Sequence, residues 1–281
     1  MTACPCLSRA VATALEEDLG HGDLTAAVCV PESLGASAEI VAKAPGVLAG
    51  MAAAAEVARQ VDGALRVAAL LGDGDGVAPG AIVARVDGLA RSVLAFERTA
   101  LNFLQQLSGV ATLTRAFVDR VAGTRAKVVD TRKTVPGLRA LQKAAVRSGG
   151  GHNHRFGLYD AILIKDNHLR VTGGVANALR RAQAGAPFMA RIEIEVTTPE
   201  EAELAAELGA DVIMLDNMTP EAAGESVARI AGRALTEVSG GVRLDTIRSY
   251  AELGVDLISV GALTHSAPAL DLSLEIREWR P

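Results

Sequence analysis

Aromatic side chains are scarce in this chain, which has one Trp, two Tyr and five Phe among its 281 residues. Proteins that bind single-stranded nucleic acid usually stack the bases on aromatic rings. The formal charge of −5 also gives the protein no general attraction for polyanions or acidic membranes. The composition therefore argues against nucleic acid and membrane surfaces as partners, and its 49% hydrophobic and 22% charged residues are ordinary for a globular protein.

Cysteine is also sparse, and all three cysteines lie within the first 29 residues. Cys4, Cys6 and Cys29 are too few for a disulfide framework, and Cys4-Pro5-Cys6 has the wrong spacing for a zinc knuckle or a redox pair. No basic stretch followed by an apolar core begins the sequence, as a signal peptide requires. The alanine-rich stretch 46–55 is interrupted by Glu56 before it could span a bilayer. We therefore expect a protein of the reducing cytoplasm.

Six short apolar runs mark the second half of the chain, and each ends in charged, polar or glycine-rich residues. The runs are Lys127–Val129, Ala161–Ile164, Arg191–Ile194, Asp211–Leu215, Leu235–Val238 and Asp256–Val260. Strands of a parallel sheet are buried on both faces and read as continuous apolar runs. Parallel α/β barrels gather their reactive side chains at the C-terminal ends of such strands. The pattern predicts an α/β barrel, and because six strands are fewer than eight, an incomplete or irregular one.

Helical segments are expected between these runs and ahead of them. Those between the runs are Gly137–Arg147, Gly174–Ala184, Pro199–Leu208, Pro220–Ile230 and Leu244–Leu253. Two of them begin with a capping threonine followed by proline, at Thr198 and Thr219, which is a typical helix start. Ahead of the runs we expect two helices, Ser92–Leu107 and Ala111–Val121, separated by a break at Ser108-Gly109.

The first hundred residues have a different pattern, with helices at 8–18 and Met51–Val61 and short strand-like pieces between turns. The pieces are Ala38–Lys43, Leu65–Leu71 and Ala81–Val86. We expect residues 1–110 to form a small α/β domain and residues 111–268 to form the barrel. The tail at 269–281 alternates apolar and polar residues, so we expect it to return as a strand to the first domain.

Positive charge is concentrated between residues 130 and 168 of this acidic protein. One set of cations repeats at intervals of four, as on a solvated helix face. It comprises Arg139, Lys143 and Arg147. Arg132, Lys133 and Lys165 instead follow buried strands, where a charge is costly unless it is paired or meets a ligand. Since guanidinium groups bind carboxylates and phosphates through two parallel hydrogen bonds, we expect a pocket for a ligand with several such groups.

Two carboxylates, Glu195 and Asp216, end strands of the same expected rim. They could bind ribose hydroxyls or help to hold magnesium, or they could pair with neighbouring lysines. The last two strands run into the turns Ser239-Gly240-Gly241 and Gly261-Ala262-Leu263-Thr264, which are typical phosphate-binding turns of barrel enzymes. The rim therefore predicts a phosphorylated sugar together with a small anionic partner.

The segment Gly149–Arg155 has no apolar run ahead of it. Its glycines allow the backbone to approach a ligand closely, and its histidines would donate to that ligand or orient it. A metal held by His152, His154 and His168 is an alternative, disfavoured because the surrounding cations would repel a divalent ion.

A series of motifs resembles the quinolinate phosphoribosyltransferase family over almost the whole chain. The motifs are Glu17–Thr25, Glu97–Asn102, Asp130–Gly137, Gly149–Arg155, Lys165–His168, Met214–Asn217 and Ser239–Gly241. The resemblance implies an N-terminal α/β sandwich with an open α/β barrel, as in type II phosphoribosyltransferases, working as a homodimer. It also implies that quinolinate and phosphoribosyl pyrophosphate give nicotinate mononucleotide, pyrophosphate and carbon dioxide.

The resemblance assigns a role to most residues of the rim. Quinolinate would meet the cations, with Arg98 reaching in from the partner subunit, while the carboxylates would face the ribose. The implied substrate-binding residues are Arg98, Thr131, Arg132, Lys133, His154, Arg155, Lys165, Glu195, Asp216, Ser239, Gly240, Gly241, Gly261, Ala262 and Leu263. The implied catalytic residues are Lys133, Lys165, Glu195 and Asp216. Magnesium would be held, directly or indirectly, by Glu195 and Asp216.

Three other activities stay open at this point. A transferase of the same fold could use another acceptor such as nicotinate, although the full set of cations favours a dicarboxylate. A class I aldolase could use Lys165 as its Schiff-base lysine. A binding module could hold the anion without reacting it.

Overall fold

The structure, a computed structural model, describes residues 5–280 and divides the chain into two compact units. One unit comprises the described part of residues 1–115 together with 134–150 and 264–281. The other comprises residues 116–133 and 151–263. Cys4 lies outside the described residues, so the role of the Cys4-Pro5-Cys6 segment stays unassigned.

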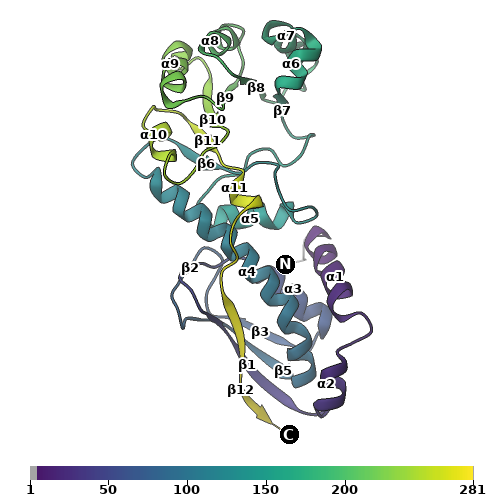
Figure 1. Ribbon diagram of the computed structural model, residues 1–281. Helices are drawn as coiled ribbons and strands as arrows, with labels where there is room; N and C mark the ends of the chain where they lie inside the picture. Colours follow the sequence, from purple (N-terminus) through teal and green to yellow (C-terminus); the bar gives the residue numbers. More distant parts are fainter. Residues whose placement is uncertain (1–4, 281) are drawn as a thin grey trace. The chain divides into compact units, whose positions relative to one another are not determined.

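The first unit contains a four-stranded antiparallel sheet in the order β12-β1-β5-β3 (Figure 1). Its strands are β1 (Gly35–Ala42), β3 (Arg66–Ala69), β5 (Ile82–Leu89) and β12 (Leu272–Arg280). The inward residues of β1, among them Ala38 and Ile40, are buried and alternate with half-buried ones. The C-terminal strand β12 runs beside β1 with Leu272 opposite Ala42, so the alternating tail forms an edge strand of this sheet.

Helix α3 (Met51–Val61) of the first unit packs against strand β3 of this sheet (Figure 1). The unit also holds further helices and a two-stranded ribbon. These elements are α1 (Pro5–Leu19), α2 (Leu24–Cys29), α3 (Met51–Val61), α5 (Arg139–Ser148), β2 (Gly46–Val47) and β4 (Gly76–Val77). The α5 side chain of Lys143 is only 3% exposed, so the expectation of a solvated face is wrong for this residue. A four-residue spacing shows that side chains share a face but not whether that face meets water.

One continuous helix, α4 (Ala90–Arg120), replaces the two expected helices, so the predicted break at Ser108-Gly109 is wrong. Ser108 is buried, and its hydroxyl bonds the backbone N–H and C=O of Ala49. A Cβ atom at Gly109 would lie 2.1 Å from the carbonyl oxygen of Pro268. The two small residues therefore serve close packing in the middle of the helix rather than ending it.

Gly109→Ala should destabilise the protein, by about 2–3 kcal/mol, because the added methyl group overlaps backbone that cannot rotate away. Urea unfolding would measure the loss as a lower midpoint. Gly224→Ala is the matched control, since Gly224 lies inside helix α9 (Pro220–Ile230) and a Cβ there would make an ordinary contact at 3.4 Å. A stability for Gly109→Ala equal to that of Gly224→Ala would refute the packing role.

The second unit is built on a six-stranded parallel sheet in the order β6-β11-β10-β9-β8-β7. Its strands are β6 (Lys127–Val129), β7 (Ile162–Ile164), β8 (Ile192–Val196), β9 (Val212–Asp216), β10 (Leu235–Ser239) and β11 (Leu257–Ser259). All six strands predicted from the apolar runs are therefore confirmed. Since β6 and β7 are the two edges and no pairing joins them within residues 5–280, the barrel is open, as expected.

Helices connect successive strands of this sheet, and α7, α8 and α9 lie along its outer side (Figure 1). The remaining helices are α6 (Asp166–Thr172), α7 (Val175–Gly185), α8 (Pro199–Glu207), α10 (Ile247–Ala251) and the short α11 (Ala262–His265). The hydroxyls of Thr198 and Thr219 accept the backbone N–H groups of Glu201 and Ala222, as the capping prediction requires. In the part of the chain that the structure describes, no helix combines the length and apolarity needed to cross a bilayer.

Candidate active site

A cavity of about 530 Å³ opens at the C-terminal ends of the second unit's strands. Eleven predicted site residues line it: Thr131, Arg132, Lys133, His154, Arg155, Lys165, Glu195, Asp216, Ser239, Gly240 and Gly241. The parallel register brings them together, since Asp216 is opposite Ser239 and Glu195 is opposite Met214. The predicted residues Gly261, Ala262 and Leu263 are not part of the lining, and Arg98 belongs to the first unit.

The carboxylate side of the cavity is formed by Glu195 and Asp216. Lys165 Nζ donates to Glu195 Oε2 at 2.8 Å, so the expected alternative of lysine pairing is realised for this carboxylate. Burial and the neighbouring charge of Glu195 raise the pKa of Asp216 above its usual range. Two adjacent carboxylates of this kind attract positive charge, such as a cationic sugar carbon or a metal ion.

Two guanidinium groups, those of Arg132 and Arg155, also line the cavity. The Arg155 Nη1 atom donates to the carbonyl oxygen of Ala161 at 3.1 Å, while its Nε is buried and has no hydrogen-bond partner among the described residues. Burial, and then the charge of Arg132, lower the pKa of Arg155. Two guanidinium groups held this close are unfavourable by themselves, and an anion between them would relieve the repulsion.

The predicted phosphate turn is shaped by a close approach between Gly240 and Asn217. Gly240 has a φ of 90°, and a Cβ atom there would lie 2.2 Å from the Asn217 side-chain oxygen. Asn217 donates its backbone N–H to Ser239 at 2.9 Å and its side-chain amide to Asp216 at 2.6 Å. The glycine is therefore required by the Asn217 contact, which couples the turn to the Asp216 carboxylate.

The Gly149–Arg155 segment departs from its expected role in one place. A Cβ at Gly149 would lie 2.4 Å from the carbonyl oxygen of Ala111, so this glycine allows helix packing rather than approach to a ligand. Further along, His152 pairs with Val129 beside β6, and buried Asp130 accepts the backbone N–H of His154 at 2.9 Å. The segment thus lies along the open edge of the sheet.

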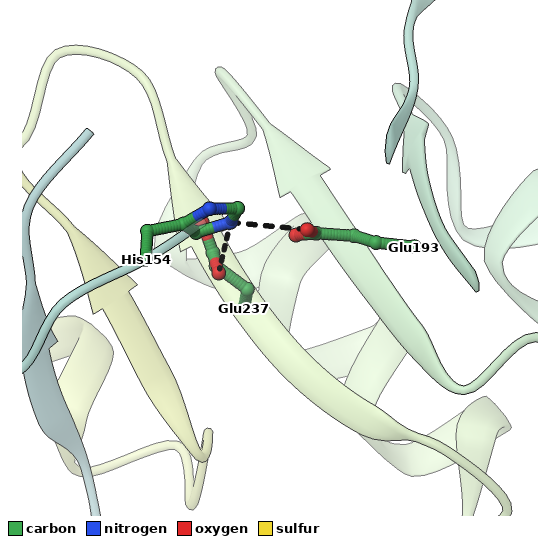
Figure 2. Close-up of side chains that lie close together, drawn as sticks. All are labelled: His154, Glu193 and Glu237. Carbon is green, nitrogen blue, oxygen red and sulfur yellow. Dashed lines mark ion pairs between the residues drawn. The ribbon is translucent and has the colours of Figure 1, made fainter. Parts of the chain in front are cut away.

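The three histidines considered as a metal set are not brought together. His168 Nδ1 accepts the backbone N–H of Lys165 at 2.9 Å and so caps its own helix. His154 instead lies against two glutamates, Glu193 from β8 and Glu237 from β10 (Figure 2). Among residues 5–280 this trio is the one group of three or more His, Cys, Asp or Glu side chains that lie close enough together to share a metal ion.

Glu193 and Glu237 are the main residues that the sequence reading missed. They lie inside the predicted apolar runs Arg191–Ile194 and Leu235–Val238, two residues before the rim positions Glu195 and Ser239. Side chains two apart on a strand share a face, so both glutamates lie one layer below the rim. One signal could have identified them: each is an acidic residue in a buried strand, two residues before the residue at the rim.

Burial, together with the nearby carboxylate of Glu193, raises the pKa of Glu237 to about 8. The carboxyl group is fully buried, and as an acceptor it has no donor among the described residues. At neutral pH Glu237 therefore keeps its proton.

The raised pKa makes the stability of the protein depend on pH in a defined direction. The folded state holds a proton on Glu237 that the unfolded chain releases near pH 4.5, so this stability is complete below pH 4.5 and is lost as pH rises toward 8. Glu237→Gln cannot ionise, and its Tm relative to the wild type should rise by on the order of 5 °C between pH 5 and pH 8. Exposed Glu207→Gln is the control, and Tm curves that stay parallel for Glu237→Gln would contradict the protonated state.

One cavity of this open parallel barrel is surrounded by guanidinium groups, a lysine–carboxylate pair and a glycine turn. This arrangement defines the active site of a barrel enzyme that acts on anionic substrates. Two family models cover nearly the whole chain: the N-terminal domain of quinolinate phosphoribosyl transferase matches residues 23–108, and its C-terminal domain matches residues 110–275. The chain belongs to the quinolinate phosphoribosyltransferase family.

Known proteins agree with this membership over most of their length. A probable nicotinate-nucleotide pyrophosphorylase [carboxylating] of Bacillus subtilis is 43% identical, over 92% of this chain and 90% of the relative. A nicotinate-nucleotide pyrophosphorylase [carboxylating] of Mycobacterium leprae is 44% identical, over 94% of each chain. The solved structure of the nicotinate-nucleotide pyrophosphorylase from Francisella tularensis superposes with a TM-score of 0.93 at 40% identity, covering 98% of each chain.

Proposed function

We propose that this chain transfers the phosphoribosyl group of phosphoribosyl pyrophosphate to quinolinate, giving nicotinate mononucleotide, pyrophosphate and carbon dioxide in NAD biosynthesis. The observation that carries the proposal is that one cavity is lined both by a pair of guanidinium groups, Arg132 and Arg155, and by a pair of carboxylates, Glu195 and Asp216. The first pair suits the two carboxylates of quinolinate. The second suits a sugar carbon that becomes positively charged during reaction.

In the transfer step the bond between the sugar C1 and the pyrophosphate oxygen breaks, and the pyridine nitrogen forms a new bond to C1. Glu195 and Asp216 stabilise the oxocarbenium-like charge at C1, while Lys133 and Lys165 stabilise the departing pyrophosphate. The turn Ser239–Gly241 holds the 5′-phosphate through its backbone N–H groups. No side chain needs to act as a nucleophile, which agrees with Lys165 being engaged by Glu195 at 2.8 Å.

In the second step the 2-carboxylate leaves as carbon dioxide, and its bonding electrons stay on the ring. The positive charge on the pyridinium nitrogen formed in the first step stabilises this electron pair on the adjacent C2, and C2 then takes a proton from water. The guanidinium groups of Arg132 and Arg155 hold the ring in place meanwhile. Because the ring supplies the electron sink, the protein contributes mainly orientation and fixed charge.

Magnesium is part of this proposal as the ion that accompanies phosphoribosyl pyrophosphate. The donor set fits a hard cation, because Glu195 and Asp216 offer adjacent carboxylates, and burial together with the charge of Glu195 raises the pKa of Asp216. Bound there, directly or through water, the ion would neutralise charge on the pyrophosphate.

We further propose a cytoplasmic homodimer in which Arg98 of one subunit completes the quinolinate site of the other. The proposal rests on the Glu97–Asn102 motif, and the sparse cysteines favour the cytoplasm. Inactive Arg98→Ala and Lys165→Ala proteins, mixed and allowed to exchange subunits, should regain activity, since one mixed site keeps both residues. No recovery after confirmed exchange would show that Arg98 acts within its own subunit.

The test of the activity is release of pyrophosphate and carbon dioxide from quinolinate plus phosphoribosyl pyrophosphate, with nicotinate as the alternative acceptor. Equal turnover of nicotinate would favour a different acceptor, and binding of quinolinate without pyrophosphate release would favour a binding module. Borohydride trapping of a carbonyl substrate on Lys165 would instead identify an aldolase.

A further inference from the structure

Both ring nitrogens of His154 are engaged by the protein. Its Nε2 lies 3.0 Å from Glu193 Oε2 and 3.5 Å from Glu237 Oε2. Its Nδ1 accepts the backbone N–H of Arg155 at 2.7 Å. The side chain of His154 is 13% exposed and those of the two glutamates are 8% and 0% exposed, so this arrangement is nearly closed to water.

These contacts determine where the imidazole proton lies. A backbone N–H can only donate, so Nδ1 must present a lone pair and the ring proton must be on Nε2. Nε2–H then points into the space between the two glutamates, where Glu193 accepts it (Figure 2). Glu237 lies next to the same nitrogen, with its Oε2 3.5 Å from Nε2, so a second carboxyl group borders the place of this proton.

We propose that Glu193 and Glu237 are positioning residues of the acceptor site. They fix His154 as the Nε2–H tautomer, so that its Nδ1 accepts the backbone N–H of Arg155. This hydrogen bond orients the Arg155 guanidinium group into the cavity. This inference rests on the proposed function, because quinolinate is the ligand that Arg155 would meet. Neither glutamate needs to touch that ligand.

The surroundings of His154 support a positioning role. Asp130, which is fully buried, accepts the backbone N–H of His154 at 2.9 Å and the side-chain amide of Asn153 at 2.6 Å. The backbone before Arg155 is thus held by Asp130 and the backbone at Arg155 by the His154 ring. Burying an acidic side chain lowers the stability of the fold compared with an apolar residue of the same size. Two buried acids beneath a binding residue are therefore explained by a positioning role.

Glu193→Leu and Glu193→Gln provide a matched kinetic pair. Glutamine keeps an oxygen that can accept Nε2–H, whereas leucine leaves that donor buried without a partner. We expect Glu193→Leu to raise the KM for quinolinate by about tenfold or more, with the KM for phosphoribosyl pyrophosphate within about twofold of the wild type. Glu193→Gln should recover most of the loss. Equal increases in both KM values, or no difference between the two variants, would overturn the proposal.

Nitrogen-15 NMR of histidine-labelled protein tests the tautomer directly and needs no activity. The chain has five histidines, and the His154→Gln variant would identify the His154 signals. The wild type should show Nε2–H with unprotonated Nδ1 at neutral pH, and Glu193→Leu should lose this preference. A doubly protonated ring, an Nδ1–H tautomer, or stoichiometric divalent metal in place of the Nε2 proton would each overturn the inference. If the activity assay fails but this tautomer is found, the fault lies with the proposed function and not with the His154 arrangement.

Discussion

Replacing Asp216 by Asn should lower kcat for phosphoribosyl transfer by about 10²–10³-fold while leaving the KM for quinolinate nearly unchanged. The change keeps the size of the side chain and removes the negative charge that faces the sugar carbon. That charge acts mainly when positive charge develops at C1, so its loss affects the transition state more than the bound substrates. Steady-state kinetics with each substrate varied in turn would separate the two parameters.

The same carboxylate should set the acid limb of the pH profile. Because burial and Glu195 raise the pKa of Asp216, the residue becomes protonated at a higher pH than an ordinary aspartate, and kcat should fall there. Asp119→Asn is the control, since Asp119 is exposed on α4 and lies outside the cavity. Retention of full kcat by Asp216→Asn would remove this residue from the chemistry.

The sequence was sufficient for the strands because their signal is local and repeated. A strand buried on both faces must be apolar until it emerges, so β6 and β9 could be located closely from their composition. Ser108-Gly109 was misread because a small residue inside a helix has two meanings. It can end the helix or admit a neighbouring backbone, and only the position of Pro268, far away in sequence, decides between them.

The acids beneath the rim show a second limit. A run such as Leu235–Val238 was read as apolar although it contains Glu237, because the reading looked for charge only where strands end. An ionisable side chain inside a buried strand is tolerated when a polar partner lies close by. Here that partner comes from an irregular segment 83 residues earlier, at His154. Neither local propensity nor spacing along the chain predicts this contact between Glu237 and His154.

Arg155→Ala should raise the KM for quinolinate by about 10²-fold, because a partly buried guanidinium that meets a carboxylate contributes several kcal/mol when it is removed. The KM for phosphoribosyl pyrophosphate should change little, since the phosphate turn Ser239–Gly241 and the carboxylates lie on other strands. Arg132→Ala should behave similarly, and the double variant should lose less than the sum of the single losses. The two guanidinium groups repel each other without ligand, so removing one relieves the other.

Arg155→Lys distinguishes geometry from charge in this site. Lysine keeps the charge but lacks the planar pair of donors and the Nη1 contact with Ala161, so we expect it to rescue only part of the loss. Exposed Arg147→Ala on α5 is the control for removal of a cation. If Arg155→Lys restored the wild-type KM in full, Arg155 would act only as a point charge. The orientation that Glu193, Glu237 and His154 give to its backbone would then have no effect on quinolinate binding. Suppose instead that the rescue is partial and that Glu193→Leu raises only the KM for quinolinate. Recognition of the acceptor would then depend on the buried glutamates beneath the rim.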